Sequence, residues 1–146
     1  MFVIAALVGL LACGGQSPKP CTQCADVSGS YQASQVPGSV TCDNENLTQT
    51  GAAGAIFLTQ DGSKLTLGIG STQFTGTLHT DNSALFGPAR DTAIAGSDMG
   101  VNQAGSVYIA GFFNQASAGS RFDFDGTYFF IQDSNGCEVD SKMTWR

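Results

Sequence analysis

Apolar residues at every second position are the feature of this sequence that most restricts its fold. Residues 64–69 alternate Leu, Leu and Ile with polar or small residues, and the same period returns in residues 74–78, 107–113 and 122–130. A period of two places alternate side chains on one face, so each segment is predicted to be a strand with one buried face.

Turn residues separate these segments. Asp61-Gly62 favours a type I′ hairpin turn, and residues 80–83 and 133–136 predict two more turns. Residues 89–104 are ambiguous, and their glycines favour a loop. Since no segment has the length and pattern of a helix, we predict an antiparallel up-and-down β-barrel of about eight short strands. An open β-sandwich is the alternative.

Three of the predicted strands share an apolar-x-Gly-x-apolar pattern around Gly76, Gly111 and Gly126. Glycine weakens a strand, so its recurrence at one position indicates sharp curvature or a backbone packed close to a large neighbour. A small closed barrel requires both.

The composition of the chain changes at Cys13. Residues 1–12 are almost entirely apolar, too short a run for the roughly 20 residues that span a bilayer, and typical of a signal peptide. All six Lys and Arg and all twelve Asp and Glu follow Cys13, so the net charge of −6 belongs to the remainder. An acidic domain argues against nucleic-acid binding and against electrostatic docking on a membrane. We expect a signal peptide at 1–12, a tether at 13–25 and a single β domain at 26–146.

The end of the apolar run resembles the lipobox of bacterial lipoprotein precursors, with Leu10 at −3, Ala12 at −1 and Cys13 at +1. It departs from that pattern at Leu11, where a small residue is usual, and in having no Lys or Arg before the run. The resemblance implies that Cys13 is alkylated by diacylglycerol and that two or three acyl chains hold the exported protein on its membrane. Gly14 after the lipidated cysteine is similar to lipoproteins sorted to the outer membrane.

Five cysteines are an odd number for an exported chain, and lipidation of Cys13 leaves four. Of the three pairings we favour Cys42–Cys137 with Cys21–Cys24. A Cys42–Cys137 bridge would close a loop of about 95 residues and constrain the unfolded chain by about 4–5 kcal/mol. Cys21 and Cys24 have redox-motif spacing, but they follow a linker and precede no helix, so we do not expect redox chemistry. A second CxxC that could complete a zinc site is absent.

The β domain also resembles lipocalins and other calycin-like barrels. Gly29-Ser30-Tyr31 stands where that family has Gly-x-Trp, Arg146 is a candidate for its Arg near the last strand, and Thr80-Asp81 matches the start of its middle motif. The Tyr in place of Trp and the shorter length are departures. The resemblance implies an up-and-down barrel that could carry a small apolar ligand.

Few residues offer catalytic or metal chemistry. His79 is the only histidine, no Gly-x-Ser-x-Gly motif occurs, and we interpret His79 as a polar residue facing water at a strand end. Asp123 and Asp125 share a strand face and resemble the start of a calcium loop, but the other ligands of such a loop are missing. We interpret them as solvated carboxylates and expect no catalytic residue, no metal and no cofactor.

Two aromatic doublets, Phe112-Phe113 and Phe129-Phe130, indicate where a partner could contact the domain. Successive strand residues face opposite sides, so one Phe of each pair points outward. We expect Phe112 and Phe129 to form an external contact patch, covered by residues 18–24, a second copy or an envelope partner, around a mostly packed interior.

The sequence thus predicts a lipid-anchored cell-envelope protein with a non-catalytic β-barrel binding or interaction domain. Its expected partners are the membrane, through the anchor, and an envelope protein or a small apolar ligand. A lipocalin-like carrier is the alternative, and an envelope hydrolase is less favoured.

Overall fold

The structure, a computed structural model, describes residues 17–36, 38–42, 45–49, 54–95, 101–116, 119, 121–134 and 136–146. All its regular elements within these ranges are strands, and all paired strands are antiparallel. The strands are β1 (Gly29–Val36), β2 (Ser39–Cys42), β3 (Glu45–Gln49), β4 (Gly54–Asp61), β5 (Lys64–Ile69), β6 (Thr72–Leu78), β7 (Ser83–Ala95), β8 (Val101–Gln115), β9 (Phe122–Gln132) and β10 (Glu138–Trp145). Within the same ranges, no helix is long and apolar enough to cross a membrane.

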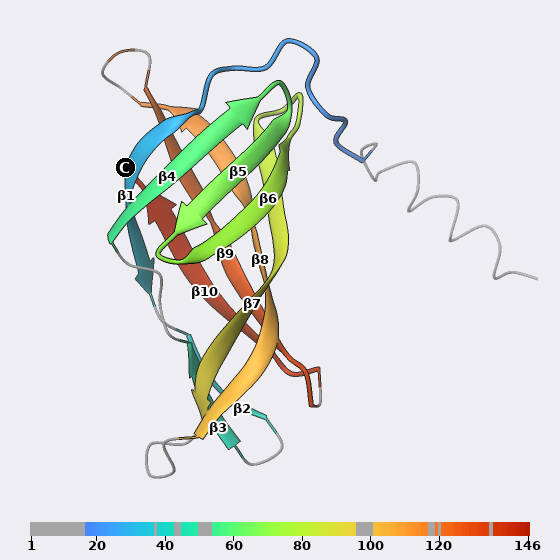
Figure 1. The fold of residues 1–146 in the computed structure, drawn as a ribbon, viewed down its shortest axis with the longest axis vertical. Coiled ribbons are helices and arrows are strands. Elements are labelled where there is room, and N and C mark those ends of the chain that lie inside the picture. Colours follow the sequence, from blue (N-terminus) through green and yellow to red (C-terminus); the bar gives the residue numbers. More distant parts are fainter. Residues whose placement is uncertain are drawn as a thin grey trace, which may run out of the picture.

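Eight of the strands close into an up-and-down barrel, which confirms the predicted fold (Figure 1). The ring runs β1-β4-β5-β6-β7-β8-β9-β10 and returns to β1, so neighbours in space are mostly neighbours in the chain. The β2–β3 hairpin interrupts this order and pairs through β3 with the last residues of β7. We call the barrel end with the β4–β5 and β6–β7 turns the tether end, and the end with the β2–β3 hairpin the distal end.

The β4–β5 turn forms one residue later in the chain than the sequence predicted. Asp61 pairs with Lys64, so the two loop residues are Gly62 and Ser63. Gly62 has a φ of 59° at the first loop position, whereas Ser63 at the second does not have a positive φ, so the turn is type II′ and not the predicted type I′.

The expected loop at residues 89–104 is wrong. Residues 89–95 continue β7 and pair with 101–107 of β8, while 47–49 of β3 pair with the other edge of β7. These distant partners supply the backbone hydrogen bonds that a strand needs, so residues 89–95 and 101–104 are strand and not loop. Residues 96–100 lie outside the described part of the chain.

The repeated glycines make room for aromatic rings inside the barrel. A Cβ on Gly76 would lie 2.5 Å from Cδ1 of Phe86, and one on Gly126 would lie 2.5 Å from Cε1 of Phe124. A Cβ on Gly111 would lie 2.7 Å from Cζ of the same Phe124 ring. The second of the two expected causes, a backbone packed close to a large neighbour, is therefore confirmed.

An aromatic cluster fills the interior around Trp145. The Trp145 ring stacks on Phe124, with centroids 4.0 Å apart and planes at 22°, and the Phe86, Phe113 and Tyr31 centroids lie within 6.0 Å of it. All five side chains are buried. At this level the barrel is closely packed with its own side chains.

Candidate functional site

The segment before β1 lies across the tether end of the barrel (Figure 1). The Cys21 amide donates to the Leu78 carbonyl at 3.0 Å, and the Thr80 amide donates to the Lys19 carbonyl at 3.0 Å. Pro20 and His79 form an isolated antiparallel bridge. The chain thus enters the barrel beside the β6–β7 turn.

The Gln60 side chain, on β4, forms hydrogen bonds with the next part of this segment. Gln60 accepts a hydrogen bond from the Val27 amide through Oε1 at 2.8 Å, and its Nε2 donates to the carbonyls of Ala25 at 2.8 Å and Gly62 at 3.0 Å. The Tyr31 hydroxyl donates to the Val27 carbonyl at 2.6 Å. Val27 is buried and Ala25 packs against the core, whereas Asp26 between them is exposed.

Cys21 and Cys24 are bonded to each other, as expected. They pack against the core, after a linker and before a strand, so the helix N-terminus that activates redox cysteines is absent here. Cys137 is also disulfide-bonded. The side chain of Cys42 and the whole of Cys13 lie outside the described part of the chain, so the Cys42–Cys137 bridge and the lipidation of Cys13 stay predictions.

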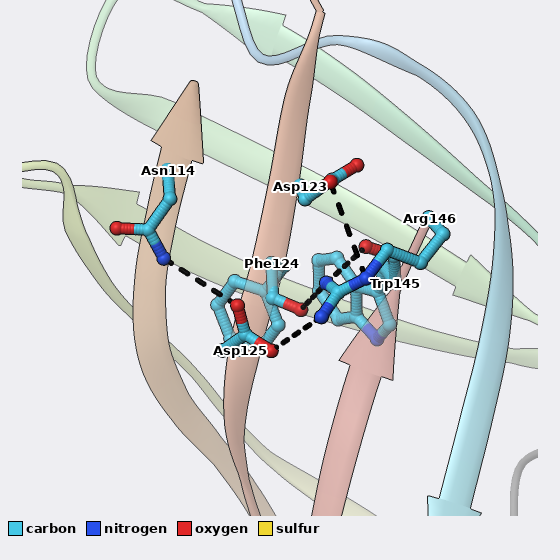
Figure 2. A network of polar contacts seen from close by, with 6 residues as sticks. All are labelled: Asn114, Asp123, Phe124, Asp125, Trp145 and Arg146. Atoms are coloured by element: carbon cyan, nitrogen blue, oxygen red, sulfur yellow. Dashed lines mark hydrogen bonds and ion pairs between the residues drawn. The ribbon is translucent and has the colours of Figure 1, made fainter. Parts of the chain in front are cut away.

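A polar network on the outer face joins the tether ends of β8, β9 and β10 (Figure 2). Nη2 of Arg146 lies 2.8 Å from Oδ1 of Asp125, and its Nε lies 4.0 Å from Oδ2 of Asp123. Nη1 donates to the Phe124 carbonyl at 3.2 Å, and the Asn114 amide contacts Asp125 at 3.5 Å. The hydrogen bond to Asp125 raises the pKa of the Arg146 guanidinium.

This network is better suited to holding strand ends than to binding a cation. The side chains of Arg146 and Asp125 are 52% and 44% exposed, so their ion pair contributes at most about 1 kcal/mol. Asp123 and Asp125 share the outer face as predicted, but the guanidinium already lies close to both, and its single positive charge offsets one of their two negative charges. They are paired carboxylates and not simply solvated ones.

Arg121 is the arginine that approaches the Tyr31 ring. The guanidinium carbon of Arg121 lies 5.6 Å from the centre of the Tyr31 ring, within cation–π range. Arg146 instead pairs with β9 and exchanges backbone hydrogen bonds with Gln32. Burial raises the pKa of the Tyr31 hydroxyl.

His79, Ser83 and Asp81 are brought together, but in an order that does not activate a nucleophile. The Ser83 hydroxyl donates to Asp81 Oδ1 at 2.6 Å, so it can only accept from Nδ1 of His79, 3.0 Å away. In a catalytic device the imidazole accepts the serine proton, which is the reverse. The Ser83 hydroxyl and amide lower the pKa of Asp81 and stabilise the β6–β7 turn.

A hollow of about 360 Å³ opens on the outer face of β5, β6 and β7 beside this turn. Lys64, Thr77 and Leu85 lie in one row of paired residues, with Thr75 and His79 on the same face. This site has no signature in the sequence, because its residues come from three strands and meet only through their register.

Phe112 and Phe129 point outward, as the doublets predicted, while Phe113 and Phe130 are buried. Phe112 is 51% exposed and pairs with Ser83, whereas Phe129 is partly buried and pairs with Tyr108, four residues before Phe112 on β8.

The two rings therefore belong to different parts of the outer face. Residues 18–24 do not cover Phe112, since that segment lies on the β6 side of the turn. The apolar neighbour of Phe112 is Leu85, which is 50% exposed on the adjacent strand.

Among the described residues, no three His, Cys, Asp or Glu side chains are grouped so that they could hold a metal ion. Comparisons with protein-family models, with curated proteins and with solved structures find no match to this chain.

Proposed function

We propose that this chain is a lipid-anchored cell-envelope protein whose barrel is a non-catalytic interaction domain that works through its outer surface. The observation that carries the proposal is the contrast between the two faces of the sheet. Buried rings occupy the interior around Trp145, while Leu85 and Phe112 remain about half exposed outside. Apolar side chains grouped on a surface usually mark a contact site.

The lipid anchor is supported by the lipobox and by the cysteine count. Cys21 is bonded to Cys24, and Cys137 is bonded to one further cysteine, so one of the five cysteines has no disulfide partner within the chain. The pairing of Cys42 with Cys137 would leave Cys13 for the lipid. The proposal places the protein in the cell envelope, on the outer membrane.

Replacing Cys13 with Ser tests the anchor. The variant should leave the membrane fraction or persist as an uncleaved precursor, because the sulfur that carries the diacylglycerol is gone. Membrane fractionation shows whether the variant has left the membrane. The intact mass of the wild type shows whether it is acylated. A Cys13→Ser chain that fractionates and migrates like the wild type would contradict the anchor.

The alternative is a carrier of a small apolar ligand, and the packed rings around Trp145 count against it. Native mass spectrometry of the purified protein and analysis of its organic extract separate the two functions. We expect no stoichiometric small molecule. A single apolar compound recovered at one equivalent from the interior would favour the carrier.

A further inference from the structure

A second hollow, of about 340 Å³, opens at the tether end of the barrel, between the start of β1 and the start of β9. One wall comes from residues 26 and 28–31, and the other from Arg121 and Phe122. A Cβ built on Gly29 would meet no atom within 4 Å, so this part of the wall faces open space. The mouth of a β-barrel is a frequent place for a small-molecule site.

Arg121 brings an unpaired positive charge to this hollow. Its guanidinium carbon lies 5.6 Å from the centre of the Tyr31 ring, and the attraction between the two limits where the group can move. The Ala116 amide donates to the Arg121 carbonyl at 2.8 Å, which fixes the backbone beside it. Arg121 forms no ion pair with any described residue. Its planar set of N–H donors, whose geometry matches a carboxylate, is therefore available in this part of the chain.

Asp26 brings a negative charge to the facing wall. The Ser28 hydroxyl and amide donate to Oδ1 of Asp26 at 2.6 Å and 3.1 Å, and they lower the pKa of its carboxyl. Both bonds go to the same oxygen, so Oδ2 accepts no hydrogen bond from a described residue. Asp26 and Arg121 line one hollow without forming an ion pair with each other. The two opposite charges are thus held apart across it.

The remaining charges near the hollow are paired with one another. Asp123 lies close enough to Tyr31 to affect the pKa of its hydroxyl, but Nε of Arg146 lies 4.0 Å from Asp123 and Nη2 lies 2.8 Å from Asp125. The hollow itself therefore presents one charge of each sign. A ligand with no net charge is not repelled by the net charge of −6 of the chain, whereas a simple anion is.

Aromatic surface completes the hollow. Tyr31 and the half-buried Phe122 both contribute to its lining, one from each wall. Apolar groups of a ligand can pack against these rings while its charged groups meet Arg121 and Asp26.

We propose that this hollow, defined by Asp26, Tyr31, Arg121 and Phe122 and called the mouth site, binds a small zwitterion of the α-amino-acid class. The Arg121 guanidinium donates to the ligand carboxylate, and Oδ2 of Asp26 accepts from the ligand ammonium. The inference goes beyond the proposed function and depends neither on the anchor at Cys13 nor on the exposed apolar side chains. Charges as exposed as these bind weakly, so the ligand exchanges with solvent and is lost on purification.

Titration of the purified full chain with L-phenylalanine, followed by amide NMR spectroscopy, tests the mouth site. The amides of Ser28, Ser30 and Arg121 should shift saturably, whereas those of Val139 and Asp140 at the distal end should not. Hydrocinnamate lacks the ammonium and phenethylamine lacks the carboxylate, so each should bind at least about five-fold more weakly. Shifts that do not saturate, or equal binding of the three compounds, overturn the zwitterion site.

Matched variants assign each charge to its partner. Arg121→Gln and Asp26→Asn should each weaken L-phenylalanine binding about five-fold, and asparagine can still accept from Ser28 through its amide oxygen. Lys142→Gln and Asp61→Asn remove exposed charges outside the hollow and should change nothing. Arg121→Gln should leave phenethylamine binding unchanged, because that compound has no carboxylate. Control variants that weaken binding as much as the test variants would show that the site is wrongly assigned.

Discussion

Glycines that face aromatic rings are the positions where one added methyl group should cost most. A Cβ on Gly126 would lie 2.5 Å from the Phe124 ring and 2.6 Å from the Ala110 carbonyl. Both atoms are fixed by the sheet and the core, so neither can easily move. We expect Gly126→Ala to lower the free energy of unfolding by about 1–3 kcal/mol in urea titrations.

Gly68 is the control for this substitution. It also lies within a strand, but the nearest atom to its Cβ is the Phe57 carbonyl oxygen at 3.8 Å. Gly68→Ala should change the stability little. Equal losses in the two variants would show that strand flexibility, and not the ring, selects glycine at position 126.

The β6–β7 turn offers a test of a single hydrogen bond. The Ser83 hydroxyl and amide both donate to Asp81 and hold the pKa of that carboxyl below its usual 3.8. Because the folded-state pKa is lowered, the contact stabilises the fold at higher pH, and the stabilisation is lost as pH falls through the folded-state pKa. In Ser83→Ala the Asp81 pKa should rise towards 3.8 in carbon-detected titrations. An unchanged pKa would mean that the hydroxyl does not donate to this carboxylate.

Among the strands, the alternation of apolar and polar residues predicted those whose whole pattern lies within a few consecutive residues. β5, β6 and β9 lie close to where periodicity and turns placed them, because the residues of each buried face are close together in the sequence. The second half of β7 was missed, since its stability comes from β3 and β8, far away in the sequence. The hollow beside the β6–β7 turn was missed for a related reason: Lys64, Thr77 and Leu85 become neighbours only through strand register.

The segment before β1 should depend on Gln60. This side chain makes hydrogen bonds to Val27, Ala25 and Gly62, and an alanine would leave the Val27 amide without its acceptor at a cost of about 1–2 kcal/mol. In Gln60→Ala, hydrogen exchange should accelerate at Cys21 and Val27 more than in β8 and β9. Gln73→Ala, an exposed amide on β6, is the control. Uniform acceleration across the barrel would argue against a local clamp.

For the whole molecule, closure at the distal end depends on the start and the end of the domain meeting. Val36 pairs with Lys142, and the Gly38 amide, two residues on, donates to the Ser141 hydroxyl at 3.0 Å. A side-chain hydrogen bond thus continues the contact with β10 past the end of β1.

A bridge between Cys42 and Cys137 would fix this closure covalently. Either alanine substitution should then lower the free energy of unfolding by a similar amount, up to about 4–5 kcal/mol in the entropic account. The double variant should be no less stable than either single one, because two partners in one bond are not additive. Non-reducing peptide mapping identifies the bond directly. A peptide joining Cys137 to any cysteine other than Cys42, or two additive losses, would contradict the pairing and leave closure of the distal end to packing and hydrogen bonds alone.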